Sequence, residues 1–147
     1  ASDNLVYIFD VHERKLIKKI EGHSNSVFSA EYSGLGKTLV SVSRDAHINF
    51  WDATNDYALK ASIPAHMYAI NHIAFRGDYK VFATGSMDKT IKIWDYEDKK
   101  LLKVIDRARH GGHLSSVNKL YWSQFNDYLI SVSDDKTISV WDLELNY

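Results

Sequence analysis

The sequence predicts an all-β fold made of about three and a half copies of one four-stranded antiparallel unit. Three observations predict it. The dipeptide Trp-Asp recurs along the chain, short aromatic and β-branched runs alternate with turn residues, and the 147 residues contain a single proline. Such runs are typical of strands. A regular interval between like residues is typical of a repeat architecture, in which each copy is one supersecondary unit.

The tryptophan residues set the period of the repeat. Trp-Asp begins at Trp51, Trp94 and Trp141, and Phe9-Asp10 is a weaker, earlier copy. The intervals between these positions are 42, 43 and 47 residues, close to the period of about 40–45 residues known for a four-stranded repeat. We expect one continuous domain, 1–147, because no linker or low-complexity stretch divides it. Its predicted units are 1–22, a half unit; 23–65 and 66–112, two whole units; and 113–147, a unit without its outer strand.

Three further residue types keep fixed offsets from each tryptophan. A histidine lies 28 residues before it, a serine or threonine ten before it, and an aspartate six before it. Four residue types at constant offsets in three copies will not arise often by chance. The sets are His23, Ser41, Asp45 and Trp51; His66, Thr84, Asp88 and Trp94; and His113, Ser131, Asp135 and Trp141.

Each unit contains short apolar runs bounded by turn residues, and each run is a predicted strand. In the last unit these are 117–122, 128–133 and 137–141, with the tight turn Asp134-Asp135-Lys136 before the third. The other predicted strands are 5–9 and 16–20 in the half unit; 27–32, 39–42, 48–51 and 59–63 in the first whole unit; and 70–75, 81–85, 90–94 and 101–105 in the second.

With these four markers the chain resembles the WD-repeat family, and the resemblance covers nearly its whole length. The resemblance implies a β-propeller of four-stranded antiparallel blades around a central channel. Propellers of this family usually have seven blades. It therefore implies a partial propeller of about three and a half blades, which we expect to be the C-terminal half of a longer ring.

The resemblance also implies that each set of four markers forms a structural hydrogen-bond tetrad. The tryptophan Nε1–H would donate to the hydroxyl, the hydroxyl to the imidazole, and the second ring nitrogen to the aspartate. Ser43, Ser86 and Ser133 lie two residues further on and are rival hydroxyls. Phe9 lacks the indole donor, so no tetrad is expected in the half unit.

Histidine, aspartate and serine together also suggest a hydrolase. We reject this interpretation because the trio recurs in three units, whereas a catalytic site is normally singular. His110 and His113 form an H-x-x-H pattern, but no acidic or cysteine ligand adjoins it. We therefore expect no enzyme activity, no metal and no cofactor.

The composition excludes several other classes of function. The net charge of −1 argues against a large nucleic-acid surface. No apolar run approaches the roughly 20 residues of a membrane-spanning helix, so no membrane partner is expected. The absence of cysteine excludes disulfides and thiolate chemistry, and it favours an intracellular compartment, which we expect to be the cytoplasm.

Partners of this family often dock on the loops between blades and on the tight turns. Methionine and tyrosine suit such interfaces, although here they could instead pack over the blade below. Arginine binds carboxylates well, so two arginines in a longer loop suggest an acidic peptide, unless that loop is merely an exposed insertion. The candidate partner-binding residues are Arg44, Met67, Tyr68, Met87, Arg107, Arg109 and Leu114.

The sequence thus predicts a non-catalytic scaffold that binds other proteins or peptides. The alternative is an assembly module: a half-propeller that completes a ring with its missing blades or with a second copy of the chain, and has no separate binding task.

Overall fold

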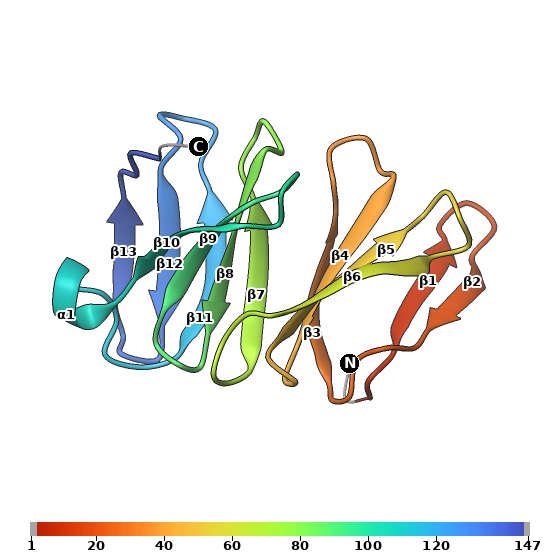
Figure 1. The fold of residues 1–147 in the computed structure, drawn as a ribbon, viewed down its shortest axis with the longest axis horizontal. Helices are drawn as coiled ribbons and strands as arrows, with labels where there is room; N and C mark the ends of the chain where they lie inside the picture. The colour runs from red at the N-terminus through yellow and green to blue at the C-terminus, as the bar shows by residue number, and fades with distance from the viewer. Residues whose placement is uncertain (1–2, 146–147) are drawn as a thin grey trace.

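The regular secondary structure of the chain is almost entirely antiparallel β-sheet (Figure 1). A computed structural model describes residues 3–145, and the four residues 1, 2, 146 and 147 of the predicted units lie outside the described part. The predicted fold class is confirmed: these are blades of a partial propeller, arranged in sequence order. The half blade is β1 (Val6–Asp10) and β2 (Lys15–Ile20); the first blade is β3 (Val27–Tyr32), β4 (Thr38–Ser43), β5 (His47–Asp52) and β6 (Ala58–Pro64); the second blade is β7 (Ile70–Phe75), β8 (Val81–Ser86), β9 (Ile91–Asp95) and β10 (Leu101–Ile105); the third blade is β11 (Val117–Trp122), β12 (Leu129–Ser133) and β13 (Ile138–Trp141).

Within each blade the burial of a strand follows its place in the sheet. Every residue of β4 and β8 is buried, because each lies second in its sheet and has a neighbouring blade beside it. Their sequences, TLVSVS and VFATGS, combine β-branched residues with small hydroxyl side chains. The strands β2 and β6 lie at the outer edges of their sheets and are mostly exposed. In the first and second blades, burial is therefore greatest in the second strand and least in the outer strand.

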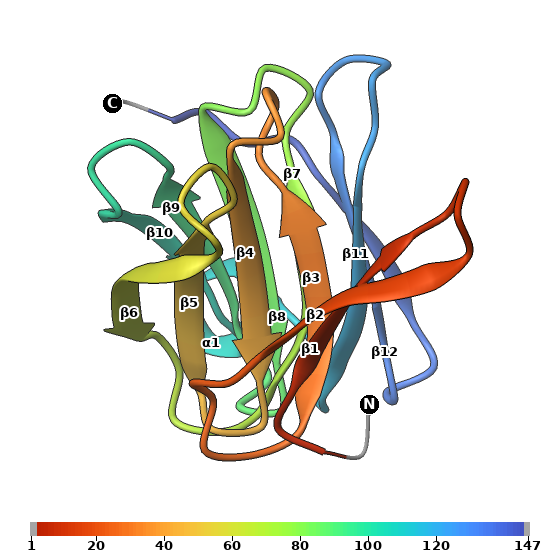
Figure 2. The same cartoon turned by 90° about the vertical axis from the view of Figure 1, so that its right-hand side faces the viewer.

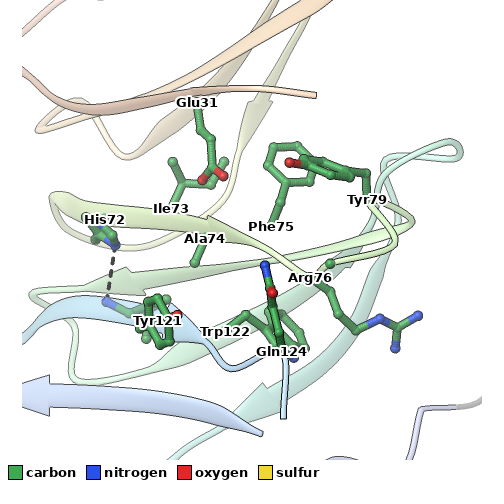
Figure 3. A pocket seen from close by; sticks show the side chains of 12 residues that line it. Glu31, His72, Ile73, Ala74, Phe75, Arg76, Tyr79, Tyr121, Trp122 and Gln124 are labelled. Atoms are coloured by element: carbon green, nitrogen blue, oxygen red, sulfur yellow. Dashed lines mark hydrogen bonds between the residues drawn. The ribbon is translucent and has the colours of Figure 1, made fainter. Parts of the chain in front are cut away.

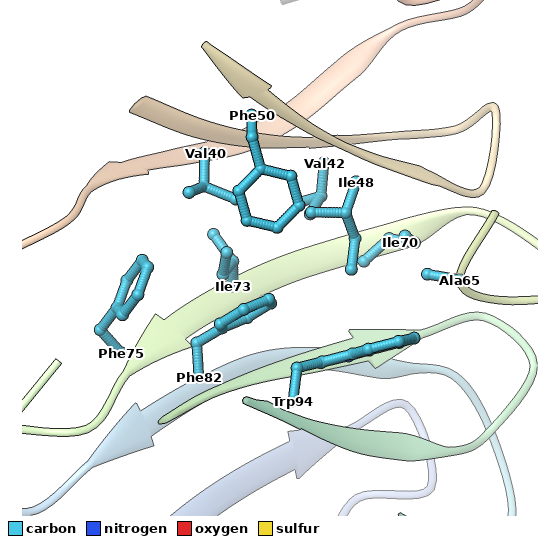
Figure 4. Close-up of a cluster of buried hydrophobic side chains, with 10 residues drawn as sticks. All are labelled: Val40, Val42, Ile48, Phe50, Ala65, Ile70, Ile73, Phe75, Phe82 and Trp94. Atoms are coloured by element: carbon cyan, nitrogen blue, oxygen red, sulfur yellow. The ribbon is translucent and has the colours of Figure 1, made fainter. Parts of the chain in front are cut away.

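The hydrophobic core lies between blades rather than within them. One cluster joins Val40, Ile48 and Phe50 of the first blade to Ile73 and Phe82 of the second (Figure 4). A second cluster joins the second and third blades, and a third joins the half blade to the first. Each blade thus needs its neighbour in order to bury its apolar face.

Of the first strands of the three larger blades, β7 contacts both β3 and β11 along the inner side of the molecule. Figure 2 shows the blades as successive layers, with β1 and β2 nearest the viewer. The connections between blades and the turns that precede β5, β9 and β13 lie at one end of the strands, the lower side of Figure 1. We call this end the tetrad face and the end with the β3–β4 and β7–β8 turns the opposite face.

Candidate functional site

The four markers of the first blade are in direct contact. The imidazole of His23 has Nδ1 2.9 Å from Asp45 Oδ2 and Nε2 2.7 Å from Ser41 Oγ. Trp51 Nε1 donates to the same Ser41 oxygen at 2.8 Å. The serine hydroxyl has one proton and already accepts from tryptophan, so it donates to His23 Nε2. The remaining imidazole proton is then on Nδ1 and is donated to the aspartate.

The same contacts recur in the second and third blades with the same atoms. Each hydroxyl lies between an indole donor and an imidazole acceptor, and each aspartate accepts from the other imidazole nitrogen. The distances are His66 Nδ1 to Asp88 Oδ2 2.8 Å, His66 Nε2 to Thr84 Oγ1 2.8 Å and Trp94 Nε1 to Thr84 Oγ1 2.9 Å; His113 Nδ1 to Asp135 Oδ2 2.9 Å, His113 Nε2 to Ser131 Oγ 2.7 Å and Trp141 Nε1 to Ser131 Oγ 2.9 Å.

The rival hydroxyls have other partners. Ser43 Oγ donates to the carbonyl of Ser26 at 2.8 Å and accepts the Asp45 N–H at 3.1 Å. Ser86 forms the corresponding bonds in the second blade. These hydroxyls hold the tight turn against the loop between blades, whereas the tetrad hydroxyls lie deeper, under the histidine.

Each tetrad aspartate also fixes two backbone segments. Asp45 Oδ2 accepts the N–H of Ser24, the residue after the histidine, and Oδ1 accepts the N–H of His47 in the tight turn. Asp88 and Asp135 form the matching pairs of bonds. The aspartate therefore links the loop between blades to the turn before the WD strand.

Two threonines extend the tetrads, and neither is among the predicted site residues. Thr90 Oγ1 donates to Asp88 Oδ1 at 2.6 Å, and Thr137 Oγ1 donates to Asp135 Oδ1 at 2.5 Å. The available signal was a threonine two residues after the aspartate in two of the three units. In the first blade His47 occupies this position, and its Nδ1 lies 2.9 Å from the backbone oxygen of Asp45.

Burial sets the charge state of the first two tetrads. It lowers the pKa of His23 and of His66, and this effect outweighs the opposing attraction of Asp45 and Asp88. Burial alone would raise the pKa of Asp45, but hydrogen bonds from His47, Ser24 and His23 hold it below its usual value. The pair is thus a neutral imidazole donating to a carboxylate.

This arrangement has no accessible nucleophile. Ser41, Thr84 and Ser131 have no exposed surface, and each hydroxyl is enclosed between an indole and an imidazole. A hydrolase would need its hydroxyl within reach of a substrate carbonyl. Across residues 3–145, no group of three or more His, Asp or Glu side chains is placed to hold a metal ion. No helix in that range is long and apolar enough to span a membrane.

Four apolar candidates for partner binding are exposed on the tetrad face. Tyr68 and Met87 lie close together, because Met87 N–H donates to the Ala69 carbonyl and Ser86 Oγ lies 3.3 Å from the Tyr68 carbonyl oxygen. The remaining candidate outside the longer loop, Arg44, is exposed in the turn of the first blade. The exposed fractions are 82% for Met67, 62% for Tyr68, 52% for Met87 and 61% for Leu114.

The longer loop carries a short helix, α1 (Arg107–His110), which the sequence analysis did not predict. Asp106 caps its first turn, and Gly111 ends it with φ of 64°. The guanidinium of Arg109 binds Asp106 Oδ2 through Nε at 2.8 Å and Nη2 at 2.6 Å, and Arg107 Nη1 donates to the Gly112 carbonyl at 3.3 Å. Both arginines thus have partners within their own loop, which reduces their availability for an acidic peptide.

Polar contacts between blades line the inner side of the molecule. A hollow of about 370 Å³ lies along β7 and β11, with Glu31 of β3 at its edge (Figure 3). Leu120 N–H donates to His72 Nδ1 at 3.1 Å, and Asn71 Nδ2 donates to Ser116 Oγ and to the Val117 carbonyl, both at 2.9 Å. Burial lowers the pKa of His72 and raises that of Glu31.

The folded repeats and their shared tetrad define a class of protein, the β-propeller built from tryptophan–aspartate blades. A family profile described as "WD domain, G-beta repeat" matches residues 14–52, 58–95 and 102–142, so the chain belongs to the WD-repeat family. The first match runs from β2 to β5. A sequence repeat therefore combines the outer strand of one blade with the three inner strands of the next.

The curated relatives of the chain have names that describe different kinds of protein. The chain is 26% identical to nuclear distribution protein PAC1 of Arthroderma benhamiae over 99% of this chain and 33% of that protein. It is 24% identical to human pre-mRNA-processing factor 17 (99% of this chain, 24% of that protein) and 27% identical to mouse WD repeat-containing protein 37 (87% and 25%). The chain thus spans about a quarter to a third of the length of these relatives.

Proposed function

We propose that the chain is a non-catalytic scaffold that binds another protein through the tetrad face. The observation that carries the proposal is the group of exposed apolar side chains, Met67, Tyr68, Met87 and Leu114, on loops that the tetrads hold in place. Large apolar side chains on rigidly supported loops are typical of interaction surfaces. The names of the relatives describe different tasks, so no particular partner is transferred from them.

The first blade provides a matched variant for testing this face. Ser24 and Asn25 occupy the positions of Met67 and Tyr68. The double substitution Met67→Ser and Tyr68→Asn therefore copies a loop that this chain already folds. We expect it to remove a partner captured by the parent chain, measured by quantitative pull-down and then by calorimetry with the purified partner.

The control substitution is Phe125→Ser, because Phe125 is 76% exposed in the turn between β11 and β12, on the opposite face. It removes similar apolar area and should leave binding intact. Equal capture by the parent chain and by the Met67/Tyr68 variant would contradict the tetrad face as the binding surface.

The outermost strands favour a second candidate, the assembly module. Apolar side chains are exposed at both ends of the blade series, and exposed strand edges pair readily with other strands. This candidate requires further blades or a second copy to cover them. The exposed residues are Phe9, Leu16 and Ile17 at one end and Ile138 and Val140 at the other.

Solution mass distinguishes self-assembly from the first candidate. A second copy predicts a mass near twice 16.9 kDa by light scattering. We then expect the double substitution Ile138→Lys and Val140→Lys to reduce the measured mass to that of a single chain. Leu35→Lys with Phe125→Lys adds the same charge at residues of similar exposure away from the strand edges and should leave the dimer intact. A single-chain mass for the parent would count against pairing with a second copy.

A further inference from the structure

A groove on the opposite face lies between the first and second blades. It has a volume of about 500 Å³, and its walls include Leu35 of the β3–β4 turn, Tyr79 of the β7–β8 turn and Tyr96 after β9. A neighbouring hollow of about 400 Å³ shares Tyr79 and Tyr96. The two tyrosine rings therefore stand between two hollows, at the end of the blades farthest from the tetrads.

Two lysines contribute positive charge to the walls of this groove. Lys37 and Lys60 both line it, and neither forms a salt bridge within residues 3–145, where the lysine and arginine ion pairs involve other side chains. Asp78 also lines the groove, but Arg76 binds its two carboxylate oxygens at 3.1 and 2.5 Å. The carboxylate of Asp78 is thus already paired. Lys60 also attracts Asp52 and helps to lower the pKa of that carboxyl group, and Asp95 and Glu97 line the neighbouring hollow, so Lys37 is the more available of the two lysines.

Tyr79 adopts a backbone conformation that tyrosine rarely takes. Its φ is 56°, and its N–H donates to the Arg76 carbonyl at 2.8 Å. The residue that corresponds to Tyr79 in the β3–β4 turn is Gly36, with φ of 68°. In the β11–β12 turn the corresponding residue is Asn126, with φ of 58°. Glycine and asparagine tolerate this region, but a bulky side chain is strained there, and such strain is concentrated at binding sites.

The surroundings of Tyr79 fix its ring as a wall of the groove. The ring packs against Phe75 with centroids 5.7 Å apart (Figure 3). On its other side a Cβ on Gly34 would lie 2.8 Å from the ring, so only glycine allows the β3–β4 turn to approach this closely. The side chain is still 40% exposed. A rigid, partly exposed aromatic ring in a groove that two lysines line suits an apolar side chain flanked by carboxylates.

We propose that this groove binds a short acidic segment of a partner protein, with one apolar side chain between Tyr79 and Tyr96 and flanking carboxylates on Lys37 and Lys60. This site is separate from the tetrad face and does not depend on binding there. It also moves the expected acidic ligand from Arg107 and Arg109, which are bound within their own loop, to two lysines that form no salt bridge within residues 3–145. Direct pairing of ammonium with carboxylate is charge-assisted and selective for acidic ligands.

The probe is a fluorescein-labelled peptide, acetyl-Asp-Asp-Phe-Asp-Asp-amide, titrated with the 147-residue chain and followed by fluorescence anisotropy. We expect saturable binding that weakens with added salt, because exposed charges are screened. The same peptide with lysine for aspartate, and the same with glycine for phenylalanine, should bind much more weakly. Equal binding of either control peptide, or tighter binding of a labelled oligothymidylate, would overturn the proposal.

Charge reversal at the two faces locates the site. Lys37→Glu with Lys60→Glu should weaken the probe about tenfold, as expected when two exposed ion pairs are replaced by repulsions. The double substitution Arg107→Glu and Arg109→Glu changes the net charge by the same amount, but on the tetrad face. It should change the affinity for the labelled peptide by less than about twofold. If the arginine pair weakens binding and the lysine pair does not, the groove is not the site.

Substitution of Tyr79 separates binding from folding. Tyr79→Asn places in this turn the residue that the β11–β12 turn already uses at the same position. We expect the probe affinity to fall several-fold, about as for loss of one aromatic contact, while the thermal midpoint stays near that of the parent. A lowered midpoint with unchanged affinity would overturn the proposal and make Tyr79 a packing residue.

Discussion

At the residue scale, the histidine is the centre of each tetrad. Its two ring nitrogens face an acceptor and a donor at once, so the neutral Nδ1–H form satisfies both. The indole donates to the hydroxyl, the hydroxyl to the imidazole and the imidazole to the carboxylate, so removal of any member leaves a buried group without one of its partners. Buried groups that lose a partner retain their desolvation penalty. The tetrad thus converts four residues that are far apart in sequence into one rigid connection.

Replacement of one histidine tests the structural role of the tetrad. His66→Ala removes the acceptor of Thr84 and the donor to Asp88, both within a buried network. We expect the free energy of unfolding to fall by about 2–3 kcal/mol, measured by urea denaturation followed through tryptophan fluorescence. His12→Ala, at an exposed histidine of the β1–β2 turn, serves as the control and should change it by less than about 0.5 kcal/mol. A fully stable His66→Ala protein would contradict the structural role.

The histidines also predict how stability depends on pH. The pKa values of His23, His66 and His72 are lowered by burial from the ordinary 6.5, so the unfolded chain binds protons more readily than the folded one. Stability is therefore complete above pH 6.5 and falls as the pH drops through the folded values. A second loss is expected below 3.8, because Asp45 and Asp88 have lowered pKa values. Urea midpoints measured from pH 8 to pH 3 check this, and a flat profile between pH 7 and 5 would contradict the histidine contribution.

At the scale of single elements, the tight turns follow directly from the tetrad aspartates. In each turn the next residue has a left-handed conformation: Ala46 has φ of 66°, Lys89 of 73° and Lys136 of 67°. None of these is glycine or asparagine. The aspartate carboxylate binds the N–H two residues ahead of it in all three turns, and these bonds offset the strain.

This strain predicts a stabilising substitution. Ala46→Gly removes a Cβ from a left-handed position without touching the hydrogen bonds of Asp45. We expect stability to rise by about 0.5–1 kcal/mol. The same change at Ala30, which lies in the regular strand β3, should lower stability by a similar amount. Calorimetric midpoints provide the comparison, and a fall for Ala46→Gly would show that the turn is not strained.

The sequence predicts the strands and tetrad members well, because both depend on local pattern and fixed offsets. It does not predict α1, since four residues are too few to show a helical period. It also misses the left-handed Tyr79, because tyrosine is not a typical turn residue. The contact of Asn71 with Ser116 joins residues 45 apart, so no local pattern contains it. The sequence therefore does not reveal the contacts that form only when two blades pack against each other.

At the scale of the whole molecule, neighbouring blades share each cluster of buried apolar residues. Phe82 of the second blade packs between Phe50 of the first and Trp94 of its own. The rings of Phe75 and Phe82 lie 5.3 Å apart. Docking of one blade on the next therefore contributes much of the burial, and stability depends on neighbours in sequence order.

Truncation of a shared core residue tests this dependence. Phe82 has no exposed surface, and Phe82→Ala should reduce stability by about 3–5 kcal/mol. Ile138→Ala at the exposed edge strand should change it by less than about 0.5 kcal/mol. Hydrogen exchange measured by mass spectrometry should show faster exchange in both β4 and β8 of the Phe82 variant. Loosening of β8 alone would contradict a core shared between blades.

The location of the core between blades has a consequence for fragments of this chain. A single excised sheet would leave both of its apolar faces in water, with no partner to bury either one. Two adjacent sheets, such as residues 27–105, retain one complete cluster. We therefore expect no single sheet of this chain to fold alone, and a cut placed between two neighbouring sheets should yield two unstructured peptides rather than two smaller domains.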